Sequence, residues 1–223
     1  AQFESVSRAK RELAHTVVSG IRRQLGSQWD DRLGICFIIA GDIVYDMAHD
    51  VPRPEQSTGE LVRGSDIDLV VILEDGAPDE FVGLLDNAIY GEKYRILTSP
   101  LYREEIDYVV KRMRRVREQV QFDTFKHMVA CKILDEGQLL FGSEALFAEI
   151  KALLDEHGVS EKLEDLRARA HVFGQRAEEY LLHAEPGRAR QESLDLFYPT
   201  EESEEFEYNP GWGRSQRSTA HLI

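Results

Sequence analysis

The sequence predicts an α/β (α+β) protein in which strands and helices alternate along most of the chain. Two observations support this fold class. Short apolar runs, such as residues 33–40 and 67–73, have the length and the β-branched content of buried strands. Between them lie longer segments whose apolar residues recur every three or four positions, which is typical of amphipathic helices.

The first half of this pattern begins with a helix. Residues 6–25 carry apolar side chains at helical spacing, and the buried strand 33–40 follows. Asp42 is then expected to cap a short helix that runs to residue 47 or 48. Residues 50–64 contain two prolines and two glycines, so we predict a loop there.

The remaining elements follow from the same two periodicities. Alternation and β-branched residues predict strands at residues 67–73, 94–97, 105–110 and 137–142. Helical spacing predicts helices at residues 78–89, 116–134, 145–156 and 160–183, the last with Ser160 as its N-cap.

Composition limits the class of protein. A net charge of -14 argues against general nucleic-acid binding, which requires many contacts from Lys and Arg to phosphates. No apolar run approaches the roughly 18 residues that a membrane span needs, and the N-terminus has no signal-peptide pattern, so we expect a cytoplasmic protein that does not enter membranes. The two cysteines, Cys36 and Cys131, lie in apolar stretches and are expected to be buried, reduced thiols.

The composition changes near the C-terminus. We predict a core at residues 1–145 that includes the N-terminal helix, a helical extension at 146–187, and an acidic tail at 188–223. Glutamates dominate residues 201–207, and prolines and glycines interrupt the tail, so we expect it to be extended or disordered. Its aromatic side chains are candidates for docking on the body or on a partner subunit, in a homo-oligomer or in a complex.

Two carboxylates stand at the start of the strand 67–73. Asp66 and Asp68 are two residues apart, so a strand would point both side chains to one face, roughly 7 Å apart at Cα. Mg²⁺ prefers carboxylate oxygens and often shares its coordination with substrate phosphates. The pair therefore predicts a site for Mg²⁺ or Mn²⁺. The alternative is one acid in a turn and one solvated acid at a strand end.

The order of these features resembles the DNA polymerase β-like nucleotidyltransferase superfamily. The resemblance rests on Ser-Asp-Ile-Asp-Leu at residues 65–69, on Gly41 after the preceding strand, and on Asp107 within a later apolar strand. The glycine-flanked segment 137–142 agrees in order. The resemblance covers roughly residues 30–150 and implies a nucleotidyltransferase core, a small mixed twisted sheet backed by helices.

This resemblance implies a reaction and a role for each carboxylate. A nucleoside monophosphate would pass from an NTP to a hydroxyl of an acceptor, with two metal ions bound. Asp66 and Asp68 would ligate the metal that carries the triphosphate. Asp68 and Asp107 would hold the metal that lowers the pKa of the acceptor hydroxyl, and Asp107 would also accept its proton.

The acceptor stays open between a small molecule such as an aminoglycoside, a protein side chain, an RNA 3′ end and another nucleotide. The acidic composition favours a small molecule or a protein. Locally, residues 59–66 are similar to the protein-modifying adenylyl- and uridylyltransferases. Five basic residues at positions 111–117 are candidates for binding the triphosphate or an RNA acceptor, and the alternative is a solvated helix start.

The sequence departs from the pattern of this family at the position that binds the phosphates. The family usually has Gly-Gly or Gly-Ser where this chain has Gly41 and Asp42, and an acid there would repel a triphosphate. Together with Ser65 and Arg63, these residues are the candidate nucleotide-binding set. The alternative reading is a catalytically silent nucleotidyltransferase fold that serves as a nucleotide sensor or as a subunit of a complex.

Overall fold

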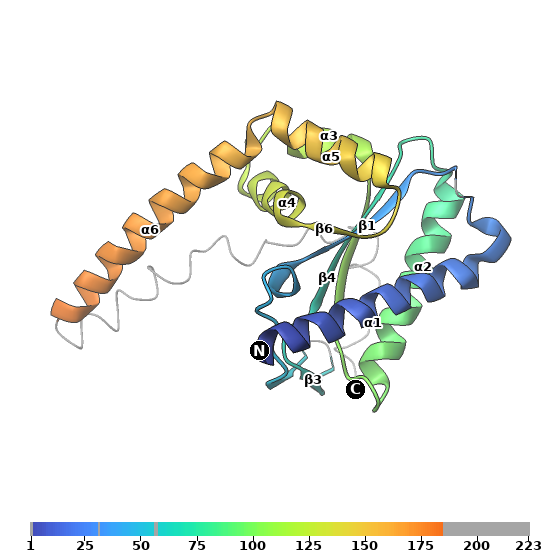
Figure 1. Cartoon of the computed structure of the whole chain (residues 1–223), viewed down its shortest axis with the longest axis horizontal. Helices are drawn as coiled ribbons and strands as arrows, with labels where there is room; N and C mark the ends of the chain where they lie inside the picture. The colour runs from blue at the N-terminus through green and yellow to red at the C-terminus, as the bar shows by residue number, and fades with distance from the viewer. Residues whose placement is uncertain (1, 31, 56–57, 185–223) are drawn as a thin grey trace, which may run out of the picture.

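The computed structural model describes residues 2–30, 32–55 and 58–184, and the acidic tail predicted from the sequence lies outside them (Figure 1). The helices are α1 (Gln2–Leu25), η1 (Gly26–Gln28), η2 (Gly41–Ile43), α2 (Asp79–Thr98), α3 (Met113–Gln119), α4 (Phe125–Glu136), α5 (Glu144–Glu156) and α6 (Val159–His183). The strands are β1 (Ile35–Ala40), β2 (Pro52–Pro54), β3 (Leu61–Arg63), β4 (Ile67–Leu73), β5 (Ile106–Arg112) and β6 (Gln138–Gly142). The predicted mixture of helices and strands is confirmed.

The centre of the molecule is a four-stranded mixed sheet in the order β5-β4-β1-β6. β4 and β5 run parallel, and β1 is antiparallel to both of its neighbours. Every residue of β1 is buried, which explains its unbroken apolar sequence. The parallel pair places the beginnings of β4 and β5 side by side, next to the end of β1.

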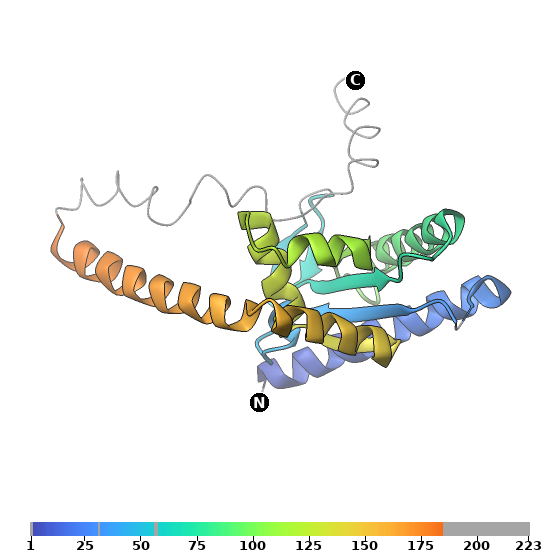
Figure 2. The ribbon, with the colours of Figure 1, turned by 90° about the horizontal axis from the view of Figure 1, so that it is seen from above.

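Helices cover both faces of this sheet (Figures 1 and 2). On one face, Phe37 and Leu69 pack with Ile21 of α1 and Leu85 of α2. The other face is covered by α3, α4, α5 and the start of α6, which form a second core. Successive strand residues alternate between these two cores, as the pleat of a strand requires.

The second core contains both cysteines of the chain. Cys36 of β1 and Cys131 of α4 are free and buried there, as predicted. Burial raises the pKa of Cys36 to about 12 and that of Cys131 to about 11. Both thiols therefore stay protonated at neutral pH and have little nucleophilic character.

The region predicted as a loop contains a small hairpin. β2 and β3 pair antiparallel, with Pro52 opposite Arg63 and Pro54 opposite Leu61. Prolines disfavour strands because they cannot donate to a ladder, but both strands of a two-stranded sheet are edges where a proline is tolerated. The prediction of a loop at residues 50–64 was therefore wrong for these two segments.

One strand prediction and one helix prediction were also wrong. Residues 94–97 continue α2 instead of forming a strand, because Ile96 is buried seven residues after Ile89 on the same helix face. The helix predicted at 116–134 is divided into α3 and α4. Phe122 has a left-handed φ of 58°, and the Thr124 hydroxyl accepts the backbone N–H of His127 and so begins a new helix.

Two predicted caps were assigned to the wrong residues. α6 begins one residue before Ser160, after Gly158, and the Ser160 hydroxyl instead donates to Asp135 at 2.7 Å. Asp42 lies inside a single turn of 3-10 helix and does not cap it. Within the part of the chain that the structure describes, no helix is long and apolar enough to cross a membrane.

Candidate functional site

The sheet register brings the three predicted carboxylates together. Asp68 lies directly opposite Asp107 in the parallel pair β4·β5, so their side chains point to the same face of the sheet. Asp66 immediately precedes β4, and two-residue alternation points it to that face too. The three acids therefore lie at the same end of the sheet, where β4 and β5 begin, although Asp107 is far from the other two in the sequence.

The electrostatics of the cluster agree with this geometry. Burial raises the pKa of Asp68 to about 7, and the charges of Asp66, Asp107, Asp42 and Glu105 add to the increase. Burial also raises the pKa of Asp66, and the charge of Asp107 raises it further. Carboxylates this close destabilise one another as anions unless a cation lies between them.

Sequence reasoning missed one acid of this cluster. Glu105 precedes Asp107 by two residues, the same spacing as Asp66 and Asp68, and it is buried. Its pKa is raised by burial first and then by Asp107. The signal that could have identified Glu105 is the two-residue alternation along the predicted strand 105–110, which puts Glu105 and Asp107 on one face. Its Oε2 is the one buried side-chain oxygen without a hydrogen bond among the residues described.

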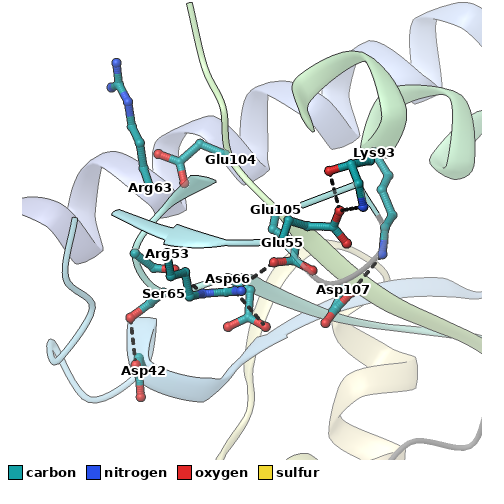
Figure 3. A network of polar contacts seen from close by, with 12 residues as sticks. Asp42, Arg53, Glu55, Arg63, Ser65, Asp66, Lys93, Glu104, Glu105 and Asp107 are labelled. Atoms are coloured by element: carbon teal, nitrogen blue, oxygen red, sulfur yellow. Dashed lines mark hydrogen bonds and ion pairs between the residues drawn. The ribbon is translucent and has the colours of Figure 1, made fainter. Parts of the chain in front are cut away.

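Two cations face the carboxylates (Figure 3). Arg53 of β2 places Nη2 2.8 Å from Glu105 Oε2 and 3.7 Å from Asp66 Oδ2. Lys93 of α2 donates to Asp107 Oδ1 at 2.8 Å. The sequence contains no local signal for either contact, because both cations come from elements distant in the chain.

These ion pairs affect how the acids are arranged. Within the described ranges, no three His, Cys, Asp or Glu side chains are grouped closely enough to form a ready metal site. Asp66 and Asp107 are each turned to a basic side chain instead. The acids share one end of the sheet, but they do not converge on a single point in this conformation.

Gly41 is required by the close approach of Asp68. Its φ is +68°, and a Cβ at this position would lie 2.0 Å from Asp68 Oδ2. The backbone after β1 therefore passes directly over the carboxylate, and an L side chain there would displace it.

Asp42 and Ser65 form a contact of their own at the rim of the cluster. The Ser65 hydroxyl donates to Asp42 Oδ2 at 2.7 Å and accepts the backbone N–H of His49 at 3.2 Å. This bond holds the exposed Asp42 at Ser65 (Figure 3). In this conformation the Ser65 hydroxyl proton is already engaged by an acid.

The other predicted basic residues lie elsewhere. The side chain of Arg63 points away from Asp66 (Figure 3). The basic group at 111–117 begins at the opposite end of β5, about 13 Å from Asp107 along the strand. Members of this group pair with acids, as Arg112 does with Asp79 and Arg117 with Asp75. The solvated, ion-paired reading suits this group better than contact with the carboxylate cluster.

No protein-family model and no curated protein matches the chain. The chemistry of the cluster is therefore inferred from its residues alone. It offers a set of oxygen ligands at a rigid sheet end, two adjacent cations, and a backbone that passes close to one carboxylate. Such a set can bind a hard divalent cation, hold a phosphate, or accept a proton.

Proposed function

We propose that the protein is a metal-dependent nucleotidyltransferase that transfers a nucleoside monophosphate from an NTP to an acceptor hydroxyl. The observation that carries this proposal is the register that places Asp68 beside Asp107, with Asp66 on the same face. The motif at residues 65–69 resembles that of the DNA polymerase β-like superfamily, and the location of its acids at one end of the sheet supports the proposal.

The residues present suit Mg²⁺ or Mn²⁺. The donors are carboxylate oxygens, which hard cations prefer. The raised pKa of Asp68 shows that anionic charge there lacks compensation, and Glu105 Oε2 is a buried acceptor with no hydrogen bond. A divalent cation would compensate the charge of Asp68, whereas Glu105 Oε2 already faces the Arg53 guanidinium at 2.8 Å. Asp66, Asp68 and Asp107 would hold the cation.

Each side chain then has a role in the transfer. The acceptor oxygen attacks the α-phosphorus of the NTP, a new P–O bond forms, and the bond to the β-phosphate breaks, so pyrophosphate leaves. Asp107 accepts the proton of the acceptor hydroxyl as a general base. The divalent ions, when bound, neutralise charge on the phosphate oxygens and acidify that hydroxyl.

Arg53 and Lys93 are the nearest candidates to hold the phosphates. The Gly-Ser dipeptide of the resembled family is replaced by Gly41 and Asp42, so its hydroxyl is missing. Arg53 has a planar fork of donors that fits phosphate oxygens, and it is placed at the carboxylates by a hairpin. Cations bound by the carboxylates would release both side chains toward the triphosphate.

The acceptor that we favour is a small molecule or a protein side chain. An RNA acceptor would need a basic path leading to the carboxylates. The basic residues 111–117 do not provide one, because they begin at the far end of β5 and are engaged with acids such as Asp75 and Asp79.

The test is pyrophosphate release from each labelled NTP with Mg²⁺ or Mn²⁺ and candidate acceptors. We expect Asp68→Asn to reduce release at least about 100-fold, because a lost metal ligand removes several kcal/mol of transition-state stabilisation. The matched control is Asp165→Asn on α6, outside the cluster. Arg53→Met should raise the KM for the NTP about tenfold, because it removes a charge-assisted hydrogen bond.

The alternative function is a silent nucleotide sensor or a subunit of a complex. The observation that favours it is the pairing of Arg53 and Lys93 with the acids, together with an acid at position 42. Nucleotide binding that depends on Mg²⁺ and Asp68, with no more pyrophosphate release than from Asp68→Asn across all acceptors, would establish this alternative.

A further inference from the structure

α6 extends beyond the rest of the molecule (Figures 1 and 2). Only its beginning belongs to the core, where Val159 and Leu163 pack with residues of α4 and α5. Further along, α6 is largely exposed within the described part of the chain. A helix of this length that stands away from its core needs another surface to stabilise it.

The projecting part of α6 carries an apolar stripe. Its members alternate at spacings of three and four residues, which keeps them on one face of a helix. They are Leu163, Leu166, Ala170, Phe173, Ala177 and Tyr180, and we call them the α6 stripe. Leu166 is 37% and Phe173 is 52% exposed. Aligned apolar side chains of this kind mark an interaction surface.

Basic and acidic residues occupy different sides of α6 relative to this stripe. Basic residues flank it, whereas the acids lie on the opposite side of the helix. The basic residues are Lys162, Arg167, Arg169 and Arg176, and the acids are Glu161, Glu164, Asp165, Glu178 and Glu179. Among the described residues, Arg176 has no ion-pair partner. A partner for the stripe should therefore be apolar and acidic.

A second copy of α6 meets this requirement poorly. Lys162, Arg169 and Arg176 follow the same edge of the stripe at intervals of seven residues. In an antiparallel pair of α6 helices these basic edges would face each other, and in a parallel pair Lys162 would face Arg167, so neither orientation supplies acids to the basic flanks.

Residues 191–208 of the same chain have the apolar and acidic composition that a partner of the α6 stripe needs. This segment lies outside the described residues, and its sequence contains seven acids and no Lys or Arg. Its apolar members are Leu194, Leu196, Phe197, Tyr198, Phe206 and Tyr208. The stripe from Leu163 to Tyr180 is about 26 Å long, and 18 residues span about 27 Å as a helix and up to about 60 Å when extended.

We propose that residues 191–208 pack along the α6 stripe in the same molecule. Pro186 and Gly187, directly after α6, allow the chain to reverse direction. The apolar side chains of the segment cover the stripe, and its acids pair with the basic flanks. This inference concerns α6 alone and is independent of the proposed transferase activity.

Hydrogen–deuterium exchange of the chain, with residues 185–223 included, tests the proposal. Light scattering measures in parallel whether each protein is a monomer or a dimer. Phe173→Glu should accelerate exchange of the α6 amides about tenfold, the change expected when a contact worth about 1.4 kcal/mol is lost. Val172→Glu is the matched control, because Val172 is also exposed but lies off the stripe; its exchange should match the wild type. All of these proteins should be monomers.

A second variant reports on the tail without altering α6. Replacing Glu201, Glu202, Glu204 and Glu205 by Lys should accelerate α6 exchange to the same extent as Phe173→Glu. If α6 exchanges at the wild-type rate in this variant, residues 191–208 do not cover the stripe. A wild-type dimer that Phe173→Glu converts to a monomer would overturn the proposal in favour of a second copy.

Discussion

At the scale of single residues, Asp68 is the side chain whose environment is most informative. Its folded-state pKa of about 7 lies above its ordinary value of 3.8 because it is buried among other acids. The folded protein therefore binds a proton at Asp68 more tightly than the unfolded chain does. Between these two pH values the folded state holds more protons at this site, so this contribution to stability falls as the pH rises.

We predict that Asp68→Asn stabilises the protein in the absence of divalent cations. At pH 8 the gain should be about 1–3 kcal/mol, less than the roughly 4 kcal/mol that three pKa units represent, because solvent still reaches the carboxylate. Urea unfolding in EDTA from pH 4 to pH 8 measures it. The difference between the two proteins should grow with pH, and a constant difference would contradict the assigned pKa.

The sequence predicts part of this site for a clear reason. Asp68 and Asp107 lie on strands, where two-residue alternation decides which side chains share a face, and Asp66 lies directly before β4. Arg53 and Lys93 reach the acids through tertiary contacts that no local pattern encodes. The orientation of Asp42 could not be predicted from local sequence either, because it depends on the Ser65 hydroxyl, 23 positions away.

At the scale of elements, the end of α4 is held by a side chain from α5. Lys151 donates to the carbonyls of Leu134 at 2.7 Å, Asp135 at 2.6 Å and Gly137 at 2.9 Å. These carbonyls lie at the C-terminus of the helix, where a cation also interacts favourably with the helix dipole. Lys151 is half-buried, and this burial lowers its pKa.

We predict that Lys151→Met destabilises the protein by about 2–3 kcal/mol, because it leaves three carbonyls at the helix end without this donor. The control is Lys132→Met, which removes a more exposed lysine paired with Glu136 and should cost at most about 1 kcal/mol. Thermal or urea unfolding measures both. Equal losses would show that Lys151 does not cap α4.

Element types were more predictable than element boundaries. The strands of the four-stranded sheet were all expected, because apolar runs flanked by glycines or acids are a strong local signal. The break before α4 was missed because residues 116–134 are periodic throughout. In the structure, the left-handed Phe122 and the capping Thr124 interrupt that periodic segment.

At the scale of the whole molecule, one buried ion pair connects three distant segments. Lys10 of α1 pairs with Glu104, just before β5, and their side chains are 3% and 10% exposed. Lys10 also donates to the carbonyl of Arg63 at 2.8 Å, at the end of the hairpin. Burial raises the pKa of Glu104 despite the opposing charge of Lys10, so this carboxylate depends on its partner to stay ionised.

We predict that Lys10→Met destabilises the protein by about 3–5 kcal/mol at pH 8, because it leaves a buried carboxylate unpaired. The double variant Lys10→Met, Glu104→Leu should recover most of that loss. Arg169→Met, which breaks the exposed pair with Asp165, is the control and should have little effect. A double variant no more stable than Lys10→Met would show that the charge of Glu104 is not the cause.

The charge at the end of the sheet where the hairpin holds Arg53 would affect how the proposed NTP substrate approaches. Five carboxylates (Asp42, Asp66, Asp68, Glu105 and Asp107) share this end of the sheet with two cations, Arg53 and Lys93, so acids outnumber bases there even though Asp68, with a pKa of about 7, is partly protonated at neutral pH. Such a field repels a bare polyanion before it makes contact. Under the proposed function, a triphosphate would therefore reach the sheet as its metal complex, and the free nucleotide would be repelled.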